Sequence, residues 1–282
     1  MPNVSPLHFF RLIALVSALT VVPSLLAENT PPLKALLITG GCCHDYANQK
    51  EILKFGIQAR ANIVVDVIYV ADKNTAPALP IYGHPDYARG YDVVIHDECA
   101  ADIKDPAIIQ GVLKPHQDGI PGVNLHCAMH CYRFGDFKKP VSAGADNAHW
   151  FEYLGLQSSG HGPQQPIAIT FTDTTHPITS GLKNWTTINE EHYNNIQVFA
   201  TAHALAHGTQ VIKSKTGAAQ TNDFVVAWVN TYQGKTRVFS TTIGHNNQTV
   251  ADDRYLDLVT RGVLWVCDKL DANGEPKPGY AK

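Results

Sequence analysis

The segment Lys34–Thr39 sets the strongest constraint on the fold of this chain. It is a nearly continuous apolar run, closed by Gly40 and Gly41, without the alternation of polar and apolar residues that a half-exposed strand shows. Such a run is typical of a central parallel strand buried on both faces. Similar runs follow, separated by helix-like segments, so we predict an α/β fold with a doubly wound sheet and right-handed crossovers. The further expected strands are 63–70, 91–96 and a short run opened at Ile120, and the expected helices are 48–61 and 106–116.

Beyond residue 135 the chain changes to short strand-like pieces. The sequence Tyr-Gln-Gly-Lys at 232–235 is a hairpin signal between the last two of them. An amphipathic helix is expected over 252–270, where it closes a single domain spanning 28–270. The Pro-, Gly- and Lys-containing segment 271–282 is expected to be a flexible tail. The strand-like pieces are 167–171, 197–202, 224–229 and 237–243.

Residues 1–27 have the features of a secretory signal peptide. Arg11 precedes an apolar run from Leu12 to Val22, and small residues lead to an exit at Ala27. This run is too short to span a bilayer comfortably, and no later run reaches the roughly twenty apolar residues that a transmembrane helix needs. We therefore expect an exported protein, periplasmic or secreted, without a membrane span.

Charge and composition narrow the class of partner. The formal net charge is −3 and there is no basic run, so a nucleic-acid partner has no electrostatic support. No glycine-rich phosphate loop and no Gly-x-Ser-x-Gly elbow is present, which argues against a tightly bound nucleotide and against a serine hydrolase. The unusual feature is 14 His residues against 2 Met.

Several of these histidines stand where a predicted strand ends. They are His44, His126, His192 in the run Glu190–Tyr193, and His245. Because the carboxyl ends of parallel strands form the ligand-binding edge of such sheets, we expect these segments to converge. Imidazole and carboxylate groups are common ligands of zinc-like metals and common general bases. A histidine taken alone is more often a structural residue than a ligand.

The turn after the fourth strand combines histidine with cysteine. His126 and His130 are four residues apart, as are Cys127 and Cys131, and each pair is predicted to share one face of a following helix. Cys127 at the start of that helix is a candidate nucleophile, with His245 or His126 as its base.

The chain has six cysteines, an even number that permits disulfides in an exported protein. Their spacing fits no small disulfide scaffold. The candidate bridge near the site joins Cys42 or Cys43 to Cys99 or Cys127.

Five short motifs occur in a fixed order: Thr39–Tyr46, Leu125–Ala128, His176–Leu182, Glu190–Tyr193 and 234–245. Together they resemble the trehalose-utilisation (ThuA-like) family, over Lys34 to about Lys269. The resemblance implies a class I glutamine amidotransferase-like fold, which is a flavodoxin-like, mostly parallel sheet with an added β excursion. In that superfamily the nucleophilic cysteine occupies the turn after the fourth strand. This chain has His126 at the turn and Cys127 one place later, and so departs from the amidotransferase pattern.

The resemblance also implies carbohydrate chemistry, on a sugar or keto-sugar derivative. We expect Glu191 and His126 to be an acid–base pair, while His44, His126 and His245 are the candidate ligands of a divalent metal such as zinc. Two alternatives stay open: a non-catalytic module that binds sugar or metal, and a hydrolase or amidase that depends on Cys127. The candidate substrate-binding residues are His44, Asp45, Tyr46, His161, Tyr193 and His245.

Overall fold

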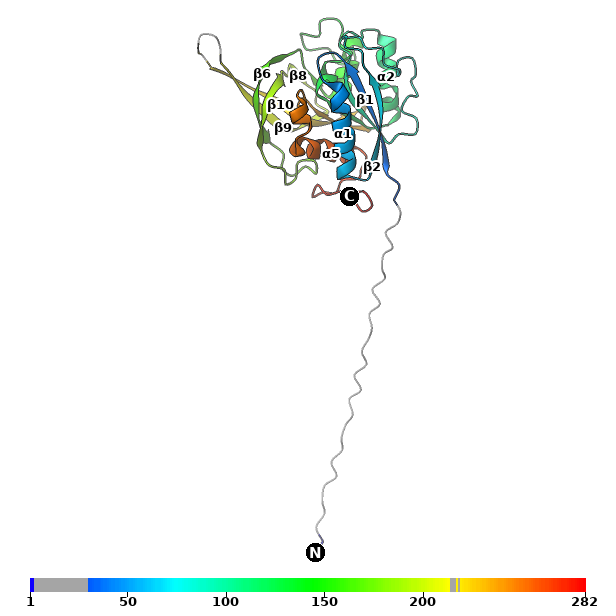
Figure 1. The fold of residues 1–282 in the computed structure, drawn as a ribbon, viewed down its shortest axis with the longest axis vertical. Helices are drawn as coiled ribbons and strands as arrows, with labels where there is room; N and C mark the ends of the chain where they lie inside the picture. Colours follow the sequence, from blue (N-terminus) through cyan, green and yellow to red (C-terminus); the bar gives the residue numbers. More distant parts are fainter. Residues whose placement is uncertain (3–29, 214–216, 218) are drawn as a thin grey trace.

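The computed structural model describes residues 1–2, 30–213, 217 and 219–282. A nine-stranded sheet with the order β2-β1-β3-β4-β11-β10-β9-β6-β7 runs through the domain (Figure 1). Its first five strands pair in parallel, in the flavodoxin-like order that leaves a crevice at the carboxyl ends of the strands. These strands are β1 (Leu33–Gly41), β2 (Ile63–Val70), β3 (Val93–Cys99), β4 (Gly122–Leu125) and β11 (Thr236–Thr241).

Four further strands extend the same sheet by antiparallel pairing. The predicted hairpin is confirmed, because Tyr232 pairs with Thr236 and the Lys235 N–H donates to the Tyr232 carbonyl at 3.1 Å. The extension consists of β6 (His161–Phe171), β7 (Trp185–Tyr193), β9 (Ala202–Lys213) and β10 (Ala219–Tyr232), and the short strands β5 (Leu156–Gln157) and β8 (Gln197–Val198) form a separate pair.

Helices cover both faces of the parallel half. On one face α1 (Tyr46–Arg60) and α5 (Asp253–Val266) lie side by side (Figure 1), with the short α4 (Asn247–Val250) beside them. On the other face lie α2 (Pro106–Asp118) and α3 (His149–Leu154). Successive residues of β1 serve different cores: Leu37 packs with the α1/α5 side and Leu36 with the α2/α3 side. Each such buried leucine contributes about 1.5–3 kcal/mol by leaving water.

Three of the expected elements differ in the structure. The segment His126–His130 is a 3₁₀ helix rather than an α-helix, so residues four apart do not share a face and that prediction is wrong. The strand expected at 197–202 is split between β8 and the start of β9. The closing helix ends at Val266 instead of continuing to residue 270.

The C-terminal segment lies against the domain, in contrast to the loose tail expected from its composition. Ala281 forms a bridge with Ala61, and the Asn62 N–H donates to the Tyr280 carbonyl at 2.9 Å. The Asn62 side chain also donates to the Gly279 carbonyl at 2.9 Å.

The predicted signal peptide, residues 1–27, falls outside the described residues apart from its first two. Within the described residues, no helix has the length and apolar character needed to cross a bilayer.

Candidate functional site

Three histidines from three strand ends meet at the carboxyl edge of the parallel strands. His44 lies in the loop after β1, His126 directly follows β4, and His245 follows β11. The ring centroid of His44 is 4.7 Å from that of His126 and 4.7 Å from that of His245. The centroids of His126 and His245 are 5.5 Å apart. The sequence-based expectation of convergence is met by these three residues.

Unusual backbone conformations hold two of these loops. His126 has a φ of 41°, a left-handed conformation that costs a residue other than glycine about 1–3 kcal/mol. Gly244, next to His245, has a φ of 129°, and a Cβ there would lie 2.7 Å from the Tyr255 hydroxyl. Strained residues held by their surroundings cluster at functional sites, and His126 is such a residue at the turn after β4.

Glu191 of β7 lies among these histidines. Its Oε1 is 3.3 Å from Nδ1 of His245, and its Oε2 is 3.5 Å from Nε2 of His126. The same Oε2 is 3.6 Å from Nε2 of His161, at the start of β6. His192 does not join the group, because successive residues of a strand face opposite ways and its ring packs against Phe224 instead.

The neighbouring carboxylate, Glu190, holds the loop that carries His245. Its Oε2 accepts a hydrogen bond from the backbone N–H of His245 at 2.9 Å, and its Oε1 accepts one from the N–H of Asn246 at 3.0 Å. The N–H of Gly244 lies 3.4 Å from the same Oε2. Gln49 of α1 donates to the His245 carbonyl at 3.0 Å. Glu190 therefore positions the site, while Glu191 faces it.

The hydrogen bonds at the back of the rings leave nitrogen atoms facing the centre. Nδ1 of His126 contacts the Thr242 carbonyl at 2.6 Å, which places the ring proton on Nδ1 and leaves Nε2 as an acceptor on the site side. Nε2 of His245 contacts the Gln164 side-chain amide at 2.7 Å. Nδ1 of His44 is buried without a hydrogen-bond partner. One ligand atom from each histidine lies within 4.8 Å of the others, so the three rings can converge on a single ion.

Burial and mutual repulsion favour neutral imidazole at His44. Burial, together with the nearby His126 and His245, lowers the pKa of His44 to about 2. Burial alone would raise the pKa of Glu191, but contacts with His126, His245 and His161 outweigh it and bring this pKa well below its ordinary value. For His245, burial lowers the pKa, but Glu191 more than offsets this, and the net shift is upward. The site thus combines an ionised carboxylate with neutral and protonatable imidazoles.

A stack of three aromatic rings lies beside the Glu191 carboxylate. Tyr193 and His130 stack with parallel rings, 4.0 Å between centroids and 2° between planes. The Tyr193 hydroxyl is 3.3 Å from Nε2 of His126. His161 continues the stack, with its ring centroid 5.6 Å from that of Tyr193, and its side chain is 41% exposed. This exposed ring offers a face to a ligand.

Comparison with known families identifies the group to which this arrangement belongs. The family model of ThuA, described as trehalose utilisation, matches residues 34–266. The chain belongs to the ThuA family. Among solved structures, it is similar to a ThuA-like protein from Parabacteroides merdae, with 19% identity, a TM-score of 0.59 and coverage of 84% of this chain and 90% of that chain. No protein of curated function matches.

A more distant similarity reaches the glutaminase domain of Trypanosoma brucei CTPS with bound acivicin. The identity is 12% and the TM-score 0.41, over 88% of this chain and all (100%) of that one. The family assignment and the strand order together confirm the predicted fold class, a flavodoxin-like ThuA domain with an added β excursion.

The surroundings of Cys127 in this ThuA domain do not suit a nucleophile. The thiol is 6% exposed and packs with Cys42, Tyr46 and Cys99. A hydrogen bond with Cys99, together with burial, raises the pKa of Cys127 well above its ordinary value. A cysteine that attacks a substrate arriving from solvent needs an accessible thiolate with a lowered pKa, and Cys127 has neither feature.

The candidate disulfide is also wrong. Cys42 is bonded to its direct neighbour Cys43, and neither is bonded to Cys99 or Cys127. A bridge between adjacent residues such as Cys42 and Cys43 is not expected from sequence, because their Cα atoms are only 3.8 Å apart, closer than in most disulfides.

The remaining predicted residues lie beside the histidines. Asp45 is exposed and accepts hydrogen bonds from Asn48 and Asn247, both at 2.7 Å. Tyr46 is 4% exposed, with its ring 5.4 Å from that of His44, so it supports His44 from behind. A cavity of about 230 Å³ opens at the ends of β1 and β2, and its lining includes His44, Asp45, Tyr46, Tyr69 and Lys73. This cavity gives a small molecule access to His44.

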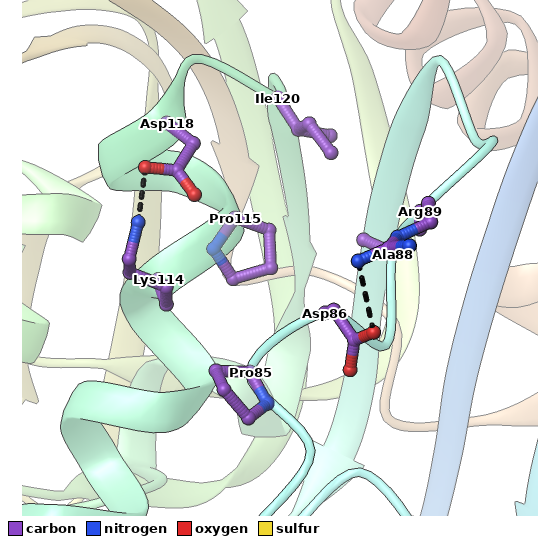
Figure 2. Close-up of a pocket in the computed structure, with 8 residues that line it drawn as sticks. All are labelled: Pro85, Asp86, Ala88, Arg89, Lys114, Pro115, Asp118 and Ile120. Atoms are coloured by element: carbon purple, nitrogen blue, oxygen red, sulfur yellow. Dashed lines mark hydrogen bonds and ion pairs between the residues drawn. The ribbon is translucent and has the colours of Figure 1, made fainter.

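A second cavity, of about 340 Å³, lies between the segment 85–89 and the end of α2 (Figure 2). Its lining includes Ile120, which precedes β4, whereas His126 follows that strand. Lys114 pairs there with Asp118, and Arg89 with Asp86, so the cavity offers no unpaired charge. It does not belong to the histidine site.

Sequence reasoning missed three contributors to the site. Gln164 contacts both His245 and, at 3.4 Å, Glu191, but its sequence context carries no motif. His130 was noted for its spacing, yet not as part of a stack with Tyr193. The sequence shows Glu190 only as one of two adjacent acidic residues. Its hydrogen bonds to the backbone of His245 and Asn246 show that it positions the loop that carries His245.

Proposed function

We propose that the chain is an exported enzyme of carbohydrate utilisation that acts on a sugar or keto-sugar derivative by acid–base chemistry. The observation that carries the proposal is the Glu191 carboxylate, which lies 3.3–3.6 Å from nitrogen atoms of His126, His161 and His245. An ionised carboxylate beside imidazoles can accept a proton from a hydroxylated carbon or hydroxyl group and return one to a leaving oxygen. Membership of the trehalose-utilisation family supports carbohydrate as the substrate class.

The residues divide the proton chemistry between them. Glu191 is held as a carboxylate by its neighbours, and it acts as the base together with His126, 3.5 Å away, because a strongly lowered pKa makes the carboxylate alone a weak proton acceptor. His245, with its raised pKa, is the group able to donate a proton near neutral pH. His126 keeps the Nε2 lone pair directed at the site because its Nδ1 proton is held by the Thr242 carbonyl, and Tyr193 hydrogen-bonds to that nitrogen. His161 presents an exposed ring against which a sugar ring can pack.

The proposal includes a divalent metal such as zinc. Three imidazoles form a donor set suited to zinc, and the buried Nδ1 of His44 has no hydrogen-bond partner. His44, His126 and His245 would hold the ion, in which case His245 would be a ligand and not the proton donor. The contacts with Thr242 and Gln164 would then orient two of the rings from behind, as outer-shell groups do at metal sites. Such an ion would supply Lewis-acid polarisation of a substrate oxygen.

Metal analysis tests this part of the proposal separately from activity. Purified mature protein and a His126→Ala/His245→Ala variant are incubated with zinc, desalted and measured by inductively coupled plasma mass spectrometry. Near-stoichiometric metal in the wild type and its loss in the variant are expected. Wild-type protein that stays free of metal after supplementation with zinc, nickel and manganese would overturn the metal assignment and leave the acid–base proposal standing.

Activity is tested with trehalose and with keto-disaccharides, followed by proton nuclear magnetic resonance of the sugar signals. Turnover that is lost in Glu191→Gln and kept in the exposed control variant Glu275→Gln is expected. Saturable binding without turnover would instead make the chain a sugar-binding module.

Export is proposed from residues 1–27. Expression of the full chain followed by fractionation and intact-mass measurement is expected to give an exported protein that begins after Ala27. Retention of the uncleaved chain inside the cell would contradict this.

A further inference from the structure

A cluster of sulfur atoms lies beside the histidine site and takes no part in the proposed acid–base chemistry. Cys42 and Cys43, in the loop after β1, form a disulfide between adjacent residues. The Sγ of Cys99, at the end of β3, lies 3.4 Å from the Sγ of Cys42. The three sulfur atoms all lie within 4.8 Å of one another. A free thiol is therefore in contact with an existing disulfide.

The three cysteines differ in their access to solvent. Cys42 is 8% and Cys99 4% exposed, whereas Cys43 is exposed. Cys43 also has a φ of 81°, a left-handed conformation that is unusual for a residue other than glycine. The disulfide thus has one buried sulfur, which faces Cys99, and one sulfur on the solvent side.

We propose that Cys42, Cys43 and Cys99 form a thiol–disulfide exchange centre whose substrate class is a low-molecular-weight or protein-borne disulfide. In the internal step the Cys99 thiolate attacks Cys42 Sγ, the Cys42–Cys43 bond breaks, and a Cys42–Cys99 bond forms. Cys43 leaves as a thiolate and takes up the proton that Cys99 gave up. The step needs no outside oxidant, because one disulfide and one thiol are present before and after it.

The exposed Cys43 thiol is then the group that meets a substrate. Its thiolate attacks one sulfur of an external disulfide, a mixed disulfide with Cys43 forms, and the other half of the substrate leaves as a thiol with the Cys43 proton. During this exchange the protein keeps one disulfide of its own, the buried Cys42–Cys99 bond. Cys99 is the attacking thiol that displaces Cys43 from Cys42, so Cys43 can act without prior reduction of the chain.

Trapping of Cys43 tests the internal step in the oxidised protein. A Cys267→Ser background removes a remote thiol, and native protein is treated with N-ethylmaleimide, digested without reduction and analysed by mass spectrometry. The expected products are a maleimide adduct on Cys43 and a disulfide between the peptides of Cys42 and Cys99. Adding Cys99→Ser is expected to abolish both. Recovery of only the Cys42–Cys43 disulfide, with Cys43 unmodified after prolonged labelling, would overturn the proposal.

A second variant tests whether Cys42 and Cys99 can pair, and it does not depend on how fast N-ethylmaleimide labels Cys43. Cys43→Ser leaves Cys42 and Cys99 as thiols in contact, and oxidised glutathione is expected to convert them to a Cys42–Cys99 disulfide that Cys43→Ser/Cys99→Ser cannot form. Circular dichroism checks that each serine variant is folded. Folded Cys43→Ser protein in which Cys42 and Cys99 fail to pair would show that the two sulfurs do not exchange.

Discussion

Nε2 of His126 lies 3.5 Å from Oε2 of Glu191, although their strands are far apart in the sheet. His126 follows β4, Glu191 is on β7, and β11, β10, β9 and β6 lie between these strands. At the usual spacing between strands, a flat sheet would separate β4 from β7 by roughly 24 Å. The antiparallel extension therefore curls back over the carboxyl edge of the parallel strands. Asn246 strengthens this closure by donating a side-chain hydrogen bond to the Asn189 carbonyl.

Glu191→Gln is expected to remove activity without unfolding the protein. The substitution keeps the size of the side chain but removes the proton acceptor, and general acid–base groups typically contribute about 10²–10⁴-fold to a rate. Turnover of the sugar substrate and the urea midpoint are measured on the same preparation. Full activity in the variant would exclude Glu191 as the base.

Glu190→Gln is expected to have the opposite profile, with a loss of stability. The Glu190 carboxylate is fully buried and accepts hydrogen bonds from the backbone of His245 and Asn246. Hydrogen bonds to a charged group are each worth about 1.5–3 kcal/mol, and an amide can replace only part of this pair, so a loss of about 1–3 kcal/mol is expected from urea denaturation. Equal stability of Glu190→Gln and Glu191→Gln would show that the two carboxylates do not differ in this way.

His192→Leu is expected to make the protein more resistant to acid. Burial lowers the pKa of His192 to about 4, whereas an unfolded histidine titrates near 6.5. Between these values the unfolded chain binds a proton that the native chain does not, so His192 makes stability fall as the pH falls from about 6.5 to about 4. Leucine removes this contribution, which is about 1.4 kcal/mol per pH unit.

Urea midpoints measured from pH 7 to pH 4 check the His192 prediction. The wild type is expected to lose stability more steeply than His192→Leu over this range. Parallel curves for the two proteins would mean that His192 takes up its proton in the native state as readily as in the unfolded chain.

Two glycine substitutions in helices are expected to act in opposite directions. A Cβ at Gly262 of α5 would lie 2.2 Å from Phe239 Cδ1, so Gly262→Ala forces α5 away from β11 and is expected to cost about 1–3 kcal/mol. A Cβ at Gly111 of α2 meets nothing within 4 Å, so Gly111→Ala is expected to stabilise by about 0.5–1 kcal/mol through helix propensity. Thermal denaturation of both variants measures the difference, and a shift of the same sign for both would contradict the packing argument.

The sequence by itself determined the parallel half of the sheet and the residues at its edge. Apolar runs such as Lys34–Thr39 encode buried strands locally, and the carboxyl ends of parallel strands meet whatever the loops do, so the convergence of His44, His126 and His245 was predictable. The family motifs also predicted the added β excursion.

Only the tertiary structure decided what surrounds these histidines. The contact of Glu191 and Gln164 with His245 depends on how far the antiparallel strands twist and curl, and no local periodicity encodes that curvature. The choice of Cys43 over Cys99 as the disulfide partner of Cys42 depends on loop conformation at the end of β1. Periodicity fixes which face of a strand a residue occupies, whereas long-range packing fixes which side chains from distant strands finally touch.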